Sequence, residues 1–162
     1  MAAYSFDVVS DFDRQELLNA VDQTRREVAQ RYDLKDSGTE IALEEASLTI
    51  TTASDMTLDA VSDVLRQKAT KRQLSPKIFD FQNREPVGGN RVQQVVKLRK
   101  GLSQDVAKKL SKKIRDAVKK VTVAIQGDAL RVSGKTKDDL QTVIHLLREE
   151  DLEMPLQFEN YR

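Results

Sequence analysis

The segment Val132-Ser133-Gly134-Lys135-Thr136 has the residue types of a phosphate-binding loop: a glycine, a lysine and a hydroxyl. A Walker loop also needs a glycine five residues before the Gly-Lys pair, because several glycine amides curl around the phosphate. That position is Ala129, and the nearest preceding glycine is Gly127. The spacing argues against a Walker loop. Thr136, followed three residues later by Asp139, predicts the N-terminal cap of a helix instead.

Cationic side chains are concentrated in one part of the chain. Residues 91–120 contain 11 basic and 2 acidic side chains, whereas residues 1–90 contain 11 basic and 16 acidic ones; the whole chain has a net charge of +1. Within this block, a helix with the apolar stripe Leu102, Val106, Leu110, Ile114 and Val118 is expected to carry its cations on other faces. They include Lys108, Lys109, Lys112 and Lys113. Such a face either contacts phosphates, with strong salt dependence, or is simply solvated.

Residues suited to catalysis are scarce. The chain has no cysteine, which excludes disulfides, thiolate zinc sites and cysteine nucleophiles. His145 is the one histidine, and its place between Ile144 and Leu146 predicts a partly buried side chain rather than a general base. The carboxylates form no metal-ligand pattern. These observations predict a protein that is not an enzyme and needs no cofactor. The N-terminal segment does not resemble a signal peptide, which favours a cytoplasmic location.

An internal repeat organises the chain. Ile41-Ala42-Leu43 lies 82 residues before Val123-Ala124-Ile125, and Leu48-Thr49-Ile50 lies 82 residues before Leu130-Arg131-Val132. The same offset relates the helical positions Leu58, Val61 and Leu65 to Leu140, Val143 and Leu147. One offset shared by two strands and a helix indicates a duplication.

Each half has the order strand, helix, strand, strand, helix, strand, which predicts an α+β protein with two ferredoxin-like βαββαβ domains. Residues 84–91 contain a proline and paired glycines and are expected to form a loop that reverses the chain. Strand 92–99 would then complete the first sheet, and the N-terminal strand 4–10 would complete the second, so that the two halves exchange their first strands. The predicted domains are 11–100 and 101–162, the latter completed by residues 4–10.

Alternation along the strands predicts which side chains lie on the open faces of the two sheets. Lys97 and Arg99 on strand 92–99, and Arg131 on strand 129–134, are expected to point outward beside hydroxyl side chains. Cationic side chains on an open sheet face either bind phosphate oxygens or are simply solvated, and the sequence pattern does not distinguish these two roles. The third strands carry no aromatic residue, so base stacking as in RNA-recognition domains is not predicted. Phe79, Phe81 and Phe158 on the last strands are expected to face the core.

The chain resembles the YajQ family of bacterial proteins along its whole length. The resemblance rests on Ser5-Phe6-Asp7-Val8-Val9-Ser10, Lys97-Leu98-Arg99-Lys100-Gly101, Ile125-Gln126-Gly127-Asp128, Asp138-Asp139-Leu140-Gln141 and Leu156-Gln157-Phe158-Glu159-Asn160-Tyr161-Arg162. Arg31-Tyr32-Asp33-Leu34 stands where the family has Arg-Phe-Asp-Phe. The resemblance implies two ferredoxin-like domains and a non-catalytic protein that binds purine nucleotides or RNA, or acts as a cyclic di-GMP effector in transcription.

Charge and resemblance together predict a nucleotide-binding protein with a regulatory role. The residues expected to contact phosphate are Lys97, Arg99, Lys100, Lys108, Lys109, Lys112, Lys113, Arg131 and Lys135. The alternative is a protein-interaction module that binds an acidic partner such as a transcription regulator.

Overall fold

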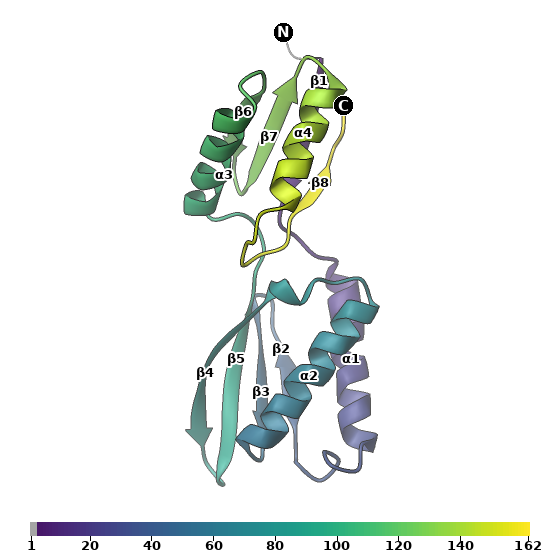
Figure 1. The fold of residues 1–162 in the computed structure, drawn as a ribbon. Helices are drawn as coiled ribbons and strands as arrows, with labels where there is room; N and C mark the ends of the chain where they lie inside the picture. Colours follow the sequence, from purple (N-terminus) through teal and green to yellow (C-terminus); the bar gives the residue numbers. More distant parts are fainter. Residues whose placement is uncertain (1–2) are drawn as a thin grey trace. The chain divides into compact units, whose positions relative to one another are not determined.

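A computed structural model describes residues 3–162 of the chain (Figure 1). It divides into two compact units, each treated by itself below. One unit comprises residues 12–99. The other combines the residues up to 11 with residues 100–162, and is called the 100–162 unit here. Each unit has one antiparallel four-stranded sheet with two helices on one face, so the predicted α+β class and duplicated architecture are confirmed.

The sheet of the 12–99 unit has the order β2-β3-β5-β4. Its elements, in chain order, are α1 (Arg14–Gln30), β2 (Glu40–Leu43), β3 (Ser47–Thr52), α2 (Asp55–Lys71), a short 3-10 helix (Pro76–Ile78), β4 (Phe79–Val87) and β5 (Arg91–Leu98). Asp13 caps α1 by accepting from the amides of Gln15 and Glu16, and Ser54 and Thr57 form a capping box at the start of α2. Local sequence therefore sets where both helices begin.

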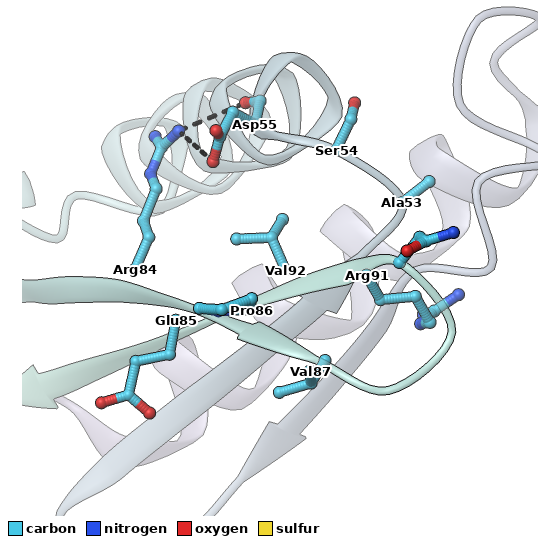
Figure 2. A pocket seen from close by; sticks show the side chains of 10 residues that line it. Ala53, Ser54, Asp55, Arg84, Glu85, Pro86, Val87, Arg91 and Val92 are labelled. Carbon is cyan, nitrogen blue, oxygen red and sulfur yellow. Dashed lines mark hydrogen bonds and ion pairs between the residues drawn. The ribbon is translucent and has the colours of Figure 1, made fainter.

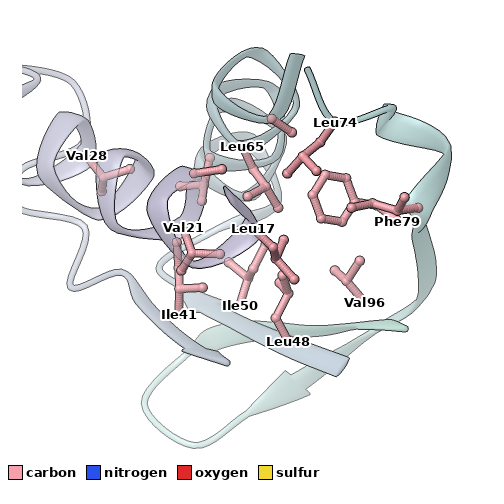
Figure 3. Packing of buried hydrophobic residues seen from close by; sticks show 14 of the residues in the cluster. Leu17, Val21, Val28, Ile41, Leu48, Ile50, Leu65, Leu74, Phe79 and Val96 are labelled. Carbon is pink, nitrogen blue, oxygen red and sulfur yellow. The ribbon is translucent and has the colours of Figure 1, made fainter. Parts of the chain in front are cut away.

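The core of this unit forms where the helices cover the sheet (Figure 3). Leu17, Val21 and Val28 of α1 point toward Ile41, Leu48 and Ile50 of the sheet, and Leu65 comes from α2. Phe79 is buried, and Phe81 packs against the same cluster, as their spacing predicted. The opposite face of the sheet has no helix layer, so its side chains are exposed or half-buried.

The sheet of the 100–162 unit has the order β6-β7-β1-β8. Its elements, in chain order, are β1 (Tyr4–Val9), α3 (Gln104–Ala117), β6 (Thr122–Gln126), β7 (Ala129–Gly134), α4 (Lys137–Arg148) and β8 (Gln157–Glu159). β1 lies between β7 and β8, just as β5 lies between β3 and β4 in the other sheet. Ser103 and Thr136 cap α3 and α4 through the amides of Val106 and Asp139. Thr136 thus has the capping role that its spacing predicted.

The 82-residue offset is visible as equivalent core positions. Leu48 and Leu130 are fully buried on third strands, and Val61 and Val143 are fully buried on second helices. Val96 and Val8 occupy equivalent places opposite those two leucines. One equivalent pair differs in residue type. Gln94 lies opposite Ile50 in the 12–99 unit, whereas Phe6 lies opposite Val132, the equivalent of Ile50, in the other unit.

Residues 84–91 reverse the chain as predicted, but the prediction that all of them form a loop is wrong. β4 continues to Val87, and the reversal is confined to Gly88, Gly89 and Asn90, of which Gly89 and Asn90 have positive φ. Pro86 is tolerated inside the strand because β4 is an edge strand, where a missing N–H costs no ladder bond. The longer hairpin adds an outward-facing surface to this sheet. Among residues 3–162, no helix combines the length and apolar character needed to span a bilayer.

Candidate functional site

The nine predicted phosphate-binding residues belong to different units. Lys97 and Arg99 lie in the 12–99 unit, and the other seven lie in the 100–162 unit. Within the latter, α3 covers the core face of the sheet, whereas Arg131 is on the open face, opposite Asp7. Arg131 and the lysines of α3 are therefore on opposite sides of one sheet and do not form a continuous cationic surface.

Four of the nine cations are engaged by carboxylates of the same unit. Arg131 donates to Asp7 from Nε at 2.9 Å and from Nη2 at 3.3 Å. Arg99 Nη2 lies 3.2 Å from Asp80, and Lys100 Nζ lies 3.7 Å from Asp11. Lys113 pairs with Glu150. These contacts offset the positive charge that a phosphate would meet at each position.

The Asp7–Arg131 pair is the most strongly organised of these contacts. Asp7 is 8% exposed and also accepts a 2.8 Å hydrogen bond from Asn160 Nδ2. The guanidinium hydrogen bonds lower the pKa of Asp7, against the opposing effect of burial, and the same bonds raise the pKa of Arg131. The geometry gives Arg131 a structural role in joining β7, β1 and the C-terminal segment.

The remaining predicted cations are exposed and make no ion pair within the described part of the chain. They are Lys97, Lys108, Lys109, Lys112 and Lys135. Lys109, Lys112 and Lys113 line a shallow hollow of about 420 Å³ on α3, together with Asp116 and Ala117. Its walls come from one helix face, so it is a basic surface rather than an enclosed pocket.

Lys97 lies in a groove of about 360 Å³ on the open face of the 12–99 sheet. The other lining residues are Gln82, Asn83, Glu85, Gln93 and Val95. Lys97 lies opposite Ser47 on β3 and Asp80 on β4. Because Arg99 holds Asp80, the charge of that carboxylate is already offset beside Lys97.

A β-bulge shapes this groove. The pairing of β4 with β5 shifts between Phe81 and Arg84, which leaves Gln82 and Asn83 out of the regular ladder. Gln94 Nε2, on the core side, donates to the backbone carbonyl of Gln82 at 2.8 Å. A bulge re-aims the side chains that it carries. Here it brings two carboxamides into a groove that β5 supplies with a third, Gln93.

A larger cavity of about 530 Å³ lies between the start of α2 and the β4–β5 hairpin of the same unit (Figure 2). Its two arginines are committed to protein atoms. Arg84 pairs with Asp55 and Asp59, mainly through a hydrogen bond to Asp59 that raises the pKa of the guanidinium. Arg91 donates to the carbonyls of Gly38 and Thr51. With Asp55 and Glu85 also on the wall, this cavity is less suited to an anion than the Lys97 groove.

Comparison with known proteins places the chain in a family. Residues 4–162 match the family model described as nucleotide-binding protein YajQ-like. The chain belongs to the YajQ family. It is 71% identical to a protein named nucleotide-binding protein from Synechococcus sp. strain CC9605, over 99% of both chains. It is 68% identical to one of the same description from Prochlorococcus marinus strain MIT 9211, again over 99% of both chains.

In this YajQ-family chain, His145 is more exposed than the sequence predicted. That side chain is 79% exposed and lies 3.5 Å from Glu149, one turn along α4, so the prediction of partial burial is wrong. His145 lies on the solvent side of α4, away from the buried Leu140, Val143, Ile144 and Leu147, so an adjacent Ile and Leu in the sequence do not imply burial. Within residues 3–162, no group of three or more His, Asp or Glu side chains is placed to hold a metal ion.

The groove also contains residues that the sequence analysis did not select. Gln93 and Val95 alternate with the buried positions of β5, so the same period that identified Lys97 also marks them. Gln82 and Asn83 carry no such signal, because the bulge interrupts the alternation. Cationic charge is a poor guide to this groove, because three of its six lining residues, Gln82, Asn83 and Gln93, are amides.

Proposed function

We propose that the Lys97 groove binds the nucleotide that the family description names. Three side-chain amides, one carboxylate and one lysine without an ion pair share this outward surface. Carboxamides both donate and accept, which suits the edges of purine bases, and a lysine acts as a point charge for phosphate. The juxtaposition of Lys97 with Gln82, Asn83 and Gln93 is the observation that carries the proposal.

The positions along β5 fit a nucleotide laid over the sheet. Gln93 and Lys97 are four residues apart on the same face, about 13 Å between Cα atoms at the rise of a strand. The long side chain of Lys97 spans part of that distance. If the phosphate contacts Lys97, the base of the nucleotide lies over Val95 and Gln93. Val95 is 37% exposed and offers apolar surface in place of the missing aromatic ring.

Glu85 gives the groove a preference between purines. It faces Gln93 across the hairpin, and an ionised carboxylate only accepts hydrogen bonds. Guanine presents two donors, N1–H and the N2 amino group, on its Watson–Crick edge. We therefore propose a guanine nucleotide, such as GTP or cyclic di-GMP, ahead of ATP, with a regulatory rather than catalytic outcome.

Calorimetry with GTP, ATP, cyclic di-GMP and a short RNA tests this proposal. Lys97→Ala removes a charge-assisted contact and is expected to weaken guanine-nucleotide binding about 10- to 100-fold. Lys71→Ala is the matched control, since Lys71 is an exposed lysine of the same unit on the last turn of α2. Glu85→Gln is expected to reduce the preference for guanine. Absence of binding at low salt, or equal affinity for the two lysine variants, contradicts the proposal.

A second function is favoured by a separate observation, the hollow on α3 lined by Lys109, Lys112 and Lys113. Lys109 and Lys112 have no ion pair in the described chain, and such exposed cations attract an acidic partner surface or the phosphates of RNA. The two are separated by nuclease treatment: a complex with an acidic regulator survives it, and a complex with RNA does not. Replacing Lys109 and Lys112 with Glu is expected to abolish either complex while leaving the Lys97 groove unaffected.

A further inference from the structure

The strand β6 forms an open edge of the 100–162 sheet. It pairs with β7 on one side, and most of its residues are exposed. Its sequence, Thr-Val-Ala-Ile-Gln, has no charge and no proline. Natural edge strands usually carry a lysine, a proline or a bulge, because their free N–H and C=O groups otherwise template pairing with another strand. β6 lacks these protections, and Ile125 on it is 44% exposed.

The backbone groups available for pairing follow from the β6–β7 hairpin. A two-residue turn, Gly127-Asp128, closes on the pair Gln126–Ala129. In an antiparallel ladder, hydrogen-bonded and non-hydrogen-bonded pairs alternate from the closing pair onward. Ala124 therefore bonds to Arg131 of β7, whereas the N–H and C=O groups of Val123 and Ile125 face away from β7 and toward the open edge.

We propose that β6 pairs antiparallel with β6 of a second copy of this chain, with Ala124 on the two-fold axis. This register places Val123 opposite Ile125 of the second copy, and Ile125 opposite its Val123. Both positions have outward backbone groups, so each pair exchanges two hydrogen bonds. Ile125 would then pack against a valine instead of facing water.

Charge at the two ends of β6 supports antiparallel pairing with a second copy. Lys119 and Lys120 precede the strand, and Asp128 follows it in the turn to β7. Antiparallel pairing brings the basic end of one β6 near the acidic end of the other, so opposite charges meet at both ends of the paired strands. All three side chains are exposed.

One effect opposes the association. α3 packs against β6, and a two-fold axis perpendicular to the sheet brings the two α3 helices to the same face of a continuous sheet. Their exposed lysines then repel, and this repulsion is screened as ionic strength rises. The pairing is therefore expected to be concentration-dependent, and clearest at moderate salt.

Analytical ultracentrifugation of the full chain, from about 1 to about 500 µM in moderate salt, tests the pairing by mass action. A concentration-dependent shift to twice the monomer mass is expected. Ile125→Lys places a cation on the edge of both copies and is expected to weaken association at least about tenfold. Ala42→Lys is the matched control, because Ala42 is an exposed residue on β2, an edge strand of the other sheet.

The antiparallel arrangement has its own test. Lys120→Asp brings carboxylates of the two copies near each other and is expected to weaken the dimer, and adding Asp128→Lys to the same chain is expected to restore it. Circular dichroism confirms that each variant is folded. A monomer over the whole concentration range, equal effects of Ile125→Lys and Ala42→Lys, or no recovery in the double variant would overturn the proposal. None of these results depends on the Lys97 groove.

Discussion

The contact between Arg131 and Asp7 leads to a prediction that separates a structural from a ligand-binding role. Arg131→Met keeps the apolar stem and removes the guanidinium. Asp7 would then remain almost fully buried, with Asn160 as its remaining hydrogen-bond donor. Loss of one partner of a buried pair costs several kcal/mol, but the Arg131 side chain is 33% exposed, so solvent screening reduces the figure. We expect the free energy of unfolding of the 100–162 unit to fall by about 2 kcal/mol at neutral pH.

The pH dependence of this loss has a defined sign. The pKa of Asp7 is lowered in the folded state, so its contribution to stability is present above the unfolded pKa, near 3.8, and is lost as pH falls through the lower folded value. Without Arg131, the largest cause that lowers the pKa of Asp7 is lost, and burial then opposes the remaining hydrogen bond from Asn160. The stability difference between wild type and Arg131→Met should therefore be largest at neutral pH and shrink below about pH 4.

Urea denaturation followed by circular dichroism, at neutral pH and at about pH 3, measures this difference. Lys135→Met is the matched control, because Lys135 is an exposed cation of the same unit with no ion pair in the described chain, and its effect should stay within about 0.5 kcal/mol. The reasoning fails if the two variants unfold alike at neutral pH. It also fails if Arg131→Met keeps full stability but loses nucleotide binding.

Three further outcomes are expected. Gly134→Val should destabilise the 100–162 unit by about 1–3 kcal/mol without altering nucleotide affinity, because a Cβ added there would lie 3.3 Å from both Leu140 and Val121; urea midpoints and calorimetry check this. Thr136→Ala removes the cap of α4 and should cost about 1 kcal/mol in the same urea measurement. Gln94→Leu leaves the carbonyl of Gln82 without its donor and also removes Gln94 Oε1, which is buried without a partner in the described chain, so urea stability should change by less than about 1 kcal/mol while the calorimetric affinity for guanine nucleotides falls.

The repeat shows how far sequence patterns predict this fold. Leu48 and Ile50 follow the two-residue period of a strand, and Val61 belongs to the apolar stripe of a helix. All three are buried, and so are their counterparts 82 residues later. Local caps such as Thr136 were also predictable, because a side-chain hydroxyl and the amide three residues later meet within one turn. These features depend on neighbours in sequence, so spacing alone reveals them.

The site was predicted less well. Lys97 was identified by its alternation with buried residues, but its neighbours Gln82 and Asn83 reach the groove through a bulge that no period shows. Arg131 was correctly placed on an open sheet face, yet the sequence did not show that it meets Asp7, 124 residues away. The distribution of charge along a sequence does not show which lysines and arginines form ion pairs with carboxylates in the folded chain.

Short-range periodicity and capping are enough to specify the duplication, most of the helices and strands, and the apolar positions of the two cores. The availability of each cation, the bulge in β4 and the hydrogen bond from Gln94 to that bulge are visible only in the folded chain. Those outcomes depend on the register between strands that are distant in sequence. A register brings specific side chains within a few ångströms of one another, and electrostatic and hydrogen-bond energies vary steeply over that distance.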